Sequence, residues 1–192
     1  MLTATKTALD KNEDVRTFGK RLGGLEEADR RLIIKGSDIF KSLCSSCHGA
    51  DAKGLVIGGT AMAAPPLKGS GRLEFAEKNN LVKIVLRGLT GPIDGKKYSS
   101  VMPSMADNSD EWIASIASFV RYEYGGKPPR RPGEIPGMAP AATDSKSGFP
   151  VRKAPSPVVT PDEVKRIREE SKGRDKPWTL DELVVKNQKA AK

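Results

Sequence analysis

Cysteine, histidine and aromatic residues are scarce in this chain of 192 residues. It has two cysteines and one histidine, which leaves no second Cys or His pair for a zinc site with four protein ligands. Aromatic residues make up 5% and hydrophobic residues 37%, which is lean for a single compact core of this length. No stretch approaches the roughly 20 consecutive apolar residues of a transmembrane helix, so we expect no membrane span.

Both cysteines and the only histidine lie within five consecutive residues, Cys44-Ser45-Ser46-Cys47-His48. The pattern C-x-x-C-H is the signature for covalent attachment of c-type haem. Each thiol can form a thioether with one haem vinyl group, and the adjacent imidazole can bind the iron as an axial ligand. A redox-active C-x-x-C pair and half of a zinc site are the alternatives, and the ligand count argues against zinc. The sequence therefore predicts one haem c, attached through Cys44 and Cys47 with His48 as ligand.

Haem is normally attached to this motif on exported bacterial chains, outside the cytoplasm. The first ten residues contain no apolar segment of the kind that forms the centre of a secretory signal. We expect a periplasmic or otherwise exported protein whose signal has been removed or replaced, or the end of a longer chain.

The formal net charge of +9 is concentrated towards the C-terminus, where residues 126–192 carry 15 basic and 9 acidic side chains. These charges are scattered among prolines, without the aromatic interleaving or the reader motifs of nucleic-acid-binding proteins. We therefore expect no nucleic-acid partner. The basic surface is either simply solvated or suited to an acidic redox partner.

Composition divides the chain into four segments. Residues 1–24 are predicted to be an N-terminal extension, with a short helix that ends at Gly23-Gly24. Residues 25–126 carry the haem motif and the strongest helical periodicity, and are predicted to form the haem domain. Residues 127–159 are rich in Pro, Gly, Ser and Ala and are typical of a linker. Residues 160–192 form a charged tail.

Apolar residues recur at helical spacing in three parts of the haem domain. The first predicts a helix over residues 25–43, in which Gly36 costs about 1 kcal/mol relative to Ala and calls for a reason, such as a close helix crossing. The second follows a possible cap at Asn79-Asn80, and the third starts at a Ser109 N-cap. Residues 49–67 are rich in Gly and Pro and are expected to wrap the haem edge as an irregular loop.

The tail contains two capping signals. Thr160-Pro161-Asp162-Glu163 is a capping box with proline at the first helical position, and Thr179 to Glu182 predicts a second, short helix through Val185. The apolar residues of the tail gather in one cluster of Trp178, Leu180, Leu183 and Val184. Such a cluster cannot form a core alone, so we expect it to dock elsewhere on the protein.

An iron that exchanges electrons without binding small molecules needs a second axial ligand. No further histidine exists, so methionine is the natural candidate. Met102 stands beside Pro103, which would stiffen its loop. A thioether ligand would favour ferrous iron and raise the reduction potential. The alternative is that Met102 only fills space, as most methionines do.

Together these residues resemble class I cytochrome c over about residues 28–125. The resemblance rests on the order of Gly36 and Phe40, Cys44 to Gly49, Pro65 to Leu67, Met102-Pro103 and a final helix bearing aromatic residues. It implies an all-α fold, in which helices pack around one covalently bound haem. The Pro-rich, partly helical C-terminal extension is absent from small members of that family.

The resemblance also assigns roles to individual residues. It implies that Gly36 and Phe40 pack across the last helix, where Phe40 would pair with Phe119. It implies further that the Pro65 carbonyl accepts the Nδ1 hydrogen of His48, a contact that fixes the orientation of the ring. The loop between His48 and Pro65 is longer than is usual in the family.

The methionine that precedes a proline in the family corresponds to Met102, and Met105 is its rival because the Met-Pro-Ser-Met spacing puts both sulfurs near one haem face. Tyr98 and Trp112 are expected to line the haem or bond a propionate, or to be ordinary core aromatics. Arg87 is a weaker propionate candidate, on charge alone.

This resemblance implies a monohaem electron carrier and not an enzyme. The tail is similar to the ends of cytochrome c domains fused to large periplasmic dehydrogenases, which implies a dehydrogenase as donor and an oxidase or another cytochrome as acceptor. Two alternatives stay open. One is a five-coordinate haem that senses or reduces a small ligand, and the other is a tail that serves as the docking module of a larger redox complex.

Overall fold

The computed structural model describes residues 18–59, 61–70, 73, 78–125 and 158–183. The chain divides into two compact units, residues 1–31 and 32–192. In the first unit, residues 18–21 form a helical turn that ends in a turn over residues 22–24, as the Gly23-Gly24 pair predicted. The rest of the predicted N-terminal extension and most of the predicted linker lie outside the described residues.

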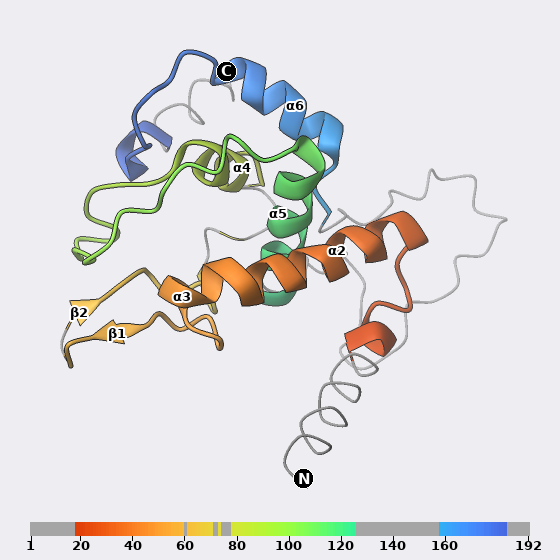
Figure 1. Ribbon diagram of the computed structural model, residues 1–192, viewed down its shortest axis with the longest axis horizontal. Helices are drawn as coiled ribbons and strands as arrows, with labels where there is room; N and C mark the ends of the chain where they lie inside the picture. The colour runs from red at the N-terminus through yellow and green to blue at the C-terminus, as the bar shows by residue number, and fades with distance from the viewer. Residues whose placement is uncertain (1–17, 60, 71–72, 74–77, 126–157, 184–192) are drawn as a thin grey trace, which may run out of the picture. The chain divides into compact units, whose positions relative to one another are not determined.

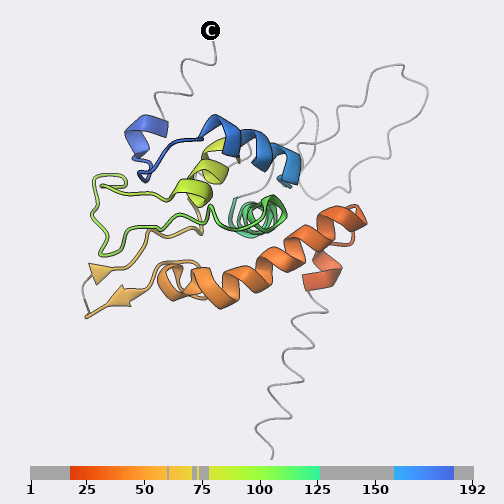
Figure 2. The same cartoon turned by 45° about the horizontal axis from the view of Figure 1, so that its top comes forward.

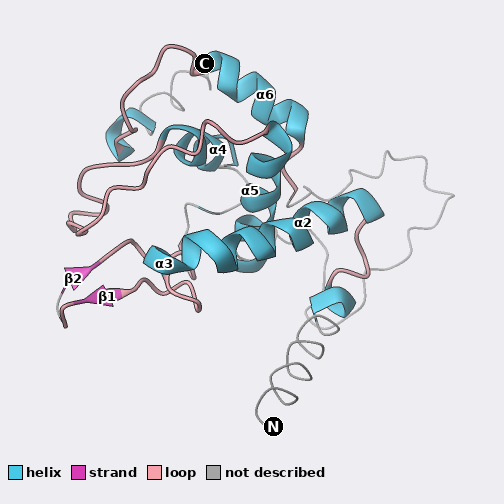
Figure 3. Cartoon of the chain, in the orientation of Figure 1, coloured by secondary structure: helices cyan, strands magenta, loops and turns pink. Residues whose placement is uncertain are grey.

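Helices dominate the regular structure of the described residues, which confirms the mostly helical fold (Figure 3). In chain order the elements are α2 (Glu27–Ile39), the π-helical turn η1 (Phe40–Cys44), α3 (Ser45–His48), β1 (Val56–Ile57), β2 (Ala61–Met62), α4 (Lys78–Arg87), α5 (Asp110–Tyr124) and α6 (Pro161–Glu170). None of the described helices combines the length and the apolarity that crossing a membrane requires.

The helix predicted over residues 25–43 is longer than expected, because α2, η1 and α3 follow one another without a break as far as His48. The π-helical turn lies directly before the C-x-x-C-H motif and ends on its first cysteine, Cys44. Single π turns inside helices are frequently found at functional sites. The motif therefore forms the C-terminal end of a continuous helical rod, which closes at Gly49, whose φ is 78°.

The close helix crossing expected at Gly36 is present between α2 and α5. A Cβ atom on Gly36 would lie 2.0 Å from the Ser115 carbonyl oxygen and 2.6 Å from the Phe119 Cβ. The rings of Phe40 and Phe119 lie beside this crossing with centroids 5.6 Å apart, and Tyr124 contacts both rings. Gly36 is thus required because the backbones of the two helices touch.

Helix α5 is the central element of the larger unit. Figure 2 views α5 nearly end-on and shows α4 and α6 on one side of it and α2 on the other. The Ser109 side chain accepts a hydrogen bond from the Trp112 amide, which confirms the predicted N-cap. The predicted Asn cap of the preceding helix is wrong, because α4 already includes Asn79 and Asn80.

The predicted loop over residues 49–67 contains a short β-hairpin. Strands β1 and β2 pair antiparallel, with Val56 opposite Met62 and Ile57 opposite Ala61 (Figure 1). Gly58 and Gly59 form its tip with φ angles of 61° and 82°. Glycine is suited to this left-handed conformation, and Gly-Gly is a known hairpin signal. The loop expectation was therefore wrong for these residues.

Helix α6 packs against α4 and α5 (Figure 1), so the described part of the tail belongs to the same unit as the haem motif. The capping box at Thr160 is complete, with Glu163 reaching back to the Thr160 amide. Val158 and Val159 just before it are buried, and the Ser118 hydroxyl of α5 is hydrogen bonded to both the amide and the carbonyl of Val159.

Charged side chains also hold α6 in place. The Arg168 guanidinium pairs with Asp110 at 2.8 Å and donates to the carbonyls of Ala106 and Asn108. Burial by itself raises the pKa of Glu163, but hydrogen bonds from Lys78 and Thr160 outweigh it and hold this pKa below its usual value. The tail is therefore attached by both apolar and charged contacts.

Candidate haem site

A cavity of about 710 Å³ lies between the C-x-x-C-H helix and the loops that follow α4 and β2. This volume lies within the 300–1,000 Å³ that ligand pockets usually have. Its lining includes seven of the predicted site residues, namely Cys44, Cys47, His48, Pro65, Tyr98, Met102 and Trp112. Residues far apart in the sequence thus line the same cavity.

The two cysteines reach the cavity from one helical stretch, since Cys44 ends η1 and Cys47 lies in α3. Neither cysteine takes part in a disulfide, and both are partly buried. Before haem is attached, burial raises the pKa of the Cys44 thiol to about 11. In the described ranges no group of three or more His, Cys, Asp or Glu side chains gathers in a way that could hold a metal ion.

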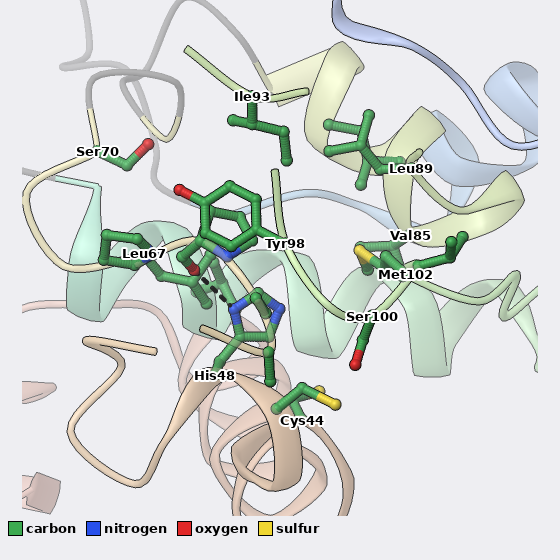
Figure 4. A pocket seen from close by; sticks show the side chains of 18 of the residues that line it. Cys44, His48, Leu67, Ser70, Val85, Leu89, Ile93, Tyr98, Ser100 and Met102 are labelled. Carbon is green, nitrogen blue, oxygen red and sulfur yellow. Dashed lines mark hydrogen bonds between the residues drawn. The ribbon is translucent and has the colours of Figure 1, made fainter. Parts of the chain in front are cut away.

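The histidine ring is oriented by the loop opposite. The His48 Nδ1 lies 3.1 Å from the Pro65 carbonyl oxygen (Figure 4), and since a carbonyl can only accept, Nδ1 carries the hydrogen. Burial lowers the pKa of His48, against the smaller raising effect of this hydrogen bond, so the ring is neutral at pH 7. The Nε2 atom of this neutral ring then carries a free lone pair, and a neutral imidazole is the form of histidine that binds a metal.

The Pro65 loop is itself fixed by backbone contacts. The amides of Leu67 and Lys68 both donate to the Ala52 carbonyl, at 2.8 and 3.1 Å. A Cβ atom on Gly54 would lie 2.7 Å from the Ala64 carbonyl oxygen, so this position has room only for glycine. The long connection between His48 and Pro65 therefore still delivers the proline carbonyl to the ring.

Met102 lies across the cavity from His48, beside Val85 and Leu89 (Figure 4). Its backbone pairs with Leu89 in both directions, with N···O distances of 3.0 and 3.1 Å. Gly88, whose φ is 81°, lets the chain come so close that a Cβ atom there would lie 2.3 Å from the Met102 carbonyl oxygen. The methionine is therefore held by the segment that ends α4.

Met105 lines the same cavity, so both methionines named by the sequence are present at it. The Met105 amide donates to the Val85 carbonyl at 3.1 Å, and the Ser104 hydroxyl donates to the Leu86 carbonyl at 2.7 Å. The whole Met-Pro-Ser-Met segment is thus attached to α4.

The remaining side chains that could contact the haem or its propionates differ in whether they line the cavity. Tyr98 and Trp112 line the cavity and are partly buried. Arg87 does not line it, because its guanidinium turns to the tail and donates to the Ser171 hydroxyl at 3.3 Å. Lys96 and Lys97 do line it and can pair with acidic groups of a ligand, but no sequence pattern distinguishes them from other exposed lysines.

The lining fits a haem. Its remaining side chains are mainly aliphatic, as the macrocycle requires, and include Leu81, Ile84, Val85, Leu89, Ile116 and Val120. Two thiols, one imidazole with a free Nε2 and a thioether supply the donor types that attach a c-type haem and bind its iron. Cys44, Cys47 and His48 would hold the group from one side, with the methionines opposite.

Comparison with known proteins identifies the family of this chain. Residues 33–123 match the cytochrome c family. The chain is 32% identical over 109 residues to cytochrome c-552 of Thermus thermophilus, a match that covers 54% of this chain and 67% of that protein. It is also 32% identical over 100 residues to the cbb3-type cytochrome c oxidase subunit CcoP of Azospirillum brasilense, covering 52% of this chain.

The match to the Azospirillum CcoP subunit covers only 31% of that subunit, so the chain spans about a third of it. A second CcoP subunit, from Rhodobacter capsulatus, is 28% identical over 117 residues, covering 60% of this chain and 37% of the subunit. The chain belongs to the cytochrome c family of electron transfer proteins and carries a covalent haem c on Cys44 and Cys47.

Proposed function

We propose that this chain transfers single electrons through its haem c with His48 and Met102 as the two axial ligands. The observation that supports this best is the single cavity lined by both cysteines, His48 and Met102. When bound, haem c supplies an iron that accepts and returns one electron. The chain's own residues then decide whether that iron serves electron transfer or ligand binding.

His48 and Met102 have different tasks in this proposal. The Pro65 carbonyl holds the His48 ring in one tautomer, which fixes the orientation of Nε2 and increases its basicity. The Met102 thioether favours the reduced state, which raises the reduction potential. As a second ligand to the iron it would also keep small molecules away. The aliphatic part of the lining would limit the access of water.

Replacing Met102 tests the sixth ligand, with Met105 as its matched control. We expect Met102→Ala to abolish the sulfur-to-iron charge-transfer band of the ferric protein, to lower its reduction potential and to let the ferrous protein bind carbon monoxide. Met105→Ala should retain the band, because the proposal gives Met105 no bond to the iron although it lines the same cavity. Visible spectra of the oxidised proteins and a redox titration measure both effects.

The opposite pattern, with the band lost in Met105→Ala alone, would make Met105 the ligand. A wild-type ferric spectrum without this band, together with ready binding of carbon monoxide, would favour the five-coordinate sensor or small-ligand reductase. Spectra of the wild type and the two methionine variants therefore distinguish Met102 ligation, Met105 ligation and a five-coordinate haem.

For the partners, we infer a periplasmic dehydrogenase as electron donor and an oxidase or another cytochrome as acceptor, in the periplasm or another exported compartment. The similarity of the tail to cytochrome c domains of large dehydrogenases supports the donor. The likeness to CcoP, whose name places it in a cytochrome c oxidase, supports an acceptor of the oxidase type.

Reduction by a cell fraction tests the donor. We expect the purified ferric protein to be reduced by a periplasmic extract of its host only after a dehydrogenase substrate such as an alcohol or a sugar is added. Absorbance of the ferrous haem follows the reaction. Reduction that instead needs respiratory membranes fed with NADH would contradict this donor and place it in the respiratory chain.

The proposal gives the tail no role as a docking module for a partner. The apolar side chains that would serve such docking, Trp178 and Leu183, are each only 3% exposed. They pack against Leu89 and Ile93 of the haem domain. A partner would have to release them first.

A further inference from the structure

Residues 88–90 lie between two other segments and are hydrogen bonded to both. On one side, Leu89 and Met102 exchange a pair of N–H···O bonds. On the other side, the Trp178 amide donates to the Gly88 carbonyl at 3.0 Å, and the Thr90 amide donates to the Trp178 carbonyl at 2.8 Å. Isolated β-bridges therefore join the segment after α4 to the methionine segment on one side and to the tail on the other, with Leu89 in the middle.

The side chains of the three bridged segments are also in contact with one another. Leu89, Ile93, Trp178 and Leu183 form one buried cluster, and the side chain of Met102 packs against it. Burial of a tryptophan contributes more apolar area than most other side chains can. The tail thus covers Leu89 and shares a cluster with the methionine.

The indole of Trp178 is itself fixed within the tail. The Arg174 guanidinium lies 3.7 Å from the centre of the indole ring, and it also donates to the Pro177 carbonyl and to Glu182. Glu182 in turn accepts from the Thr179 amide at 2.9 Å. These contacts hold Trp178 in one orientation toward Leu89.

Without the tail, the Leu89–Met102 pairing would be a two-stranded bridge with one open edge. Isolated two-stranded pairings are marginal in water. The two bonds to the Trp178 backbone close that edge, and the indole covers Leu89. The amide and the carbonyl of Leu89 are both hydrogen bonded to Met102. Contacts that restrain Leu89 therefore also restrain Met102.

We propose that the C-terminal tail positions Met102 for its role at the haem, with Trp178 as the positioning residue that acts through Leu89. This inference rests on the proposed axial ligation by Met102. It assigns to the extension a function in the site itself and not merely in the stability of the domain.

The test compares Trp178→Ala with Val164→Ala in the full-length holoprotein. Val164 is fully buried on α6, so its truncation also weakens the tail, but Val164 is not part of the cluster around Leu89. We expect Trp178→Ala to speed hydrogen exchange at the Leu89 and Met102 amides by about tenfold or more, beyond any global destabilisation. Val164→Ala should leave the local exchange of these amides unchanged.

The optical spectrum gives the second readout. Trp178→Ala should weaken the sulfur-to-iron band and increase carbon monoxide binding by the ferrous protein, while Trp178→Phe, which retains an aromatic ring, should restore most of the band. Val164→Ala should retain it. If Trp178→Ala fails to fold, the same measurements on Trp178→Phe and Trp178→Leu decide the question through a graded loss.

Two outcomes separate this inference from the proposed function. Equal exchange and equal spectra in Trp178→Ala and Val164→Ala, with a normal band in the wild type, would overturn the positioning role alone. A wild type without the band would remove the axial role of Met102. The exchange rates would then still decide whether the tail holds the Leu89–Met102 pair.

Discussion

The double variant Cys44→Ala, Cys47→Ala is expected to lose its haem and to fail to fold cooperatively. The haem site is a cavity of about 710 Å³ with largely aliphatic walls. Without the haem these apolar walls would be exposed to water, and burial of apolar surface is the main favourable contribution to a net stability of only about 5–15 kcal/mol in a typical domain. Circular dichroism during thermal melting would measure the loss.

Ser45→Ala, Ser46→Ala is the matched control, because it changes two residues of the same five-residue motif and leaves the thiols in place. The Ser45 and Ser46 hydroxyls donate to carbonyls of the preceding helical turn. This variant should attach haem and melt like the wild type. A helical, cooperatively melting protein without haem in the cysteine variant would show that the chain can fill the cavity by itself.

Gly36→Ala should lower the free energy of unfolding of the holoprotein by about 3 kcal/mol, as overpacking at a tight contact does. The new Cβ would lie 2.0 Å from the Ser115 carbonyl oxygen, so α2 and α5 would have to separate. This cost exceeds the gain of about 1 kcal/mol that alanine brings inside a helix. Urea denaturation followed by circular dichroism gives the value.

Gly19→Ala provides the comparison, since Gly19 lies in a helical turn and a Cβ atom added there would have nothing within 4 Å. It should be neutral or slightly stabilising. A loss below 1 kcal/mol in Gly36→Ala would mean that the helix crossing relaxes easily. The aromatic contact between Phe40 and Phe119 would then be expected to move with it.

Features that depend on short stretches of sequence were predictable. The caps at Ser109 and Thr160 were predicted correctly because capping requires only the side chain and backbone of the next three residues. The haem attachment motif is equally local. The cost of glycine inside a helix suggested a crossing at Gly36, and the family resemblance implied the last helix as its partner. The backbone contact with α5 that requires glycine became visible only in the structure.

Features that depend on tertiary pairing were not predictable. The two-residue strands β1 and β2 are too short to show alternation, although the Gly58-Gly59 pair was a signal for their turn. Arg87 carried a charge suited to a propionate, but the position of Ser171 decided where it points. That the tail cluster docks was expected, whereas its partner, Leu89, could not be identified from spacing.

The tail also imposes an order on folding. Its contacts with α4 join residues far apart in sequence, such as Lys78 and Glu163, which are 85 residues apart. Pairings this distant form late because closing the intervening loop costs entropy before any contact repays it. We therefore expect the contacts between the tail and α4 to form after the local helices, as the last part of the larger unit to be completed.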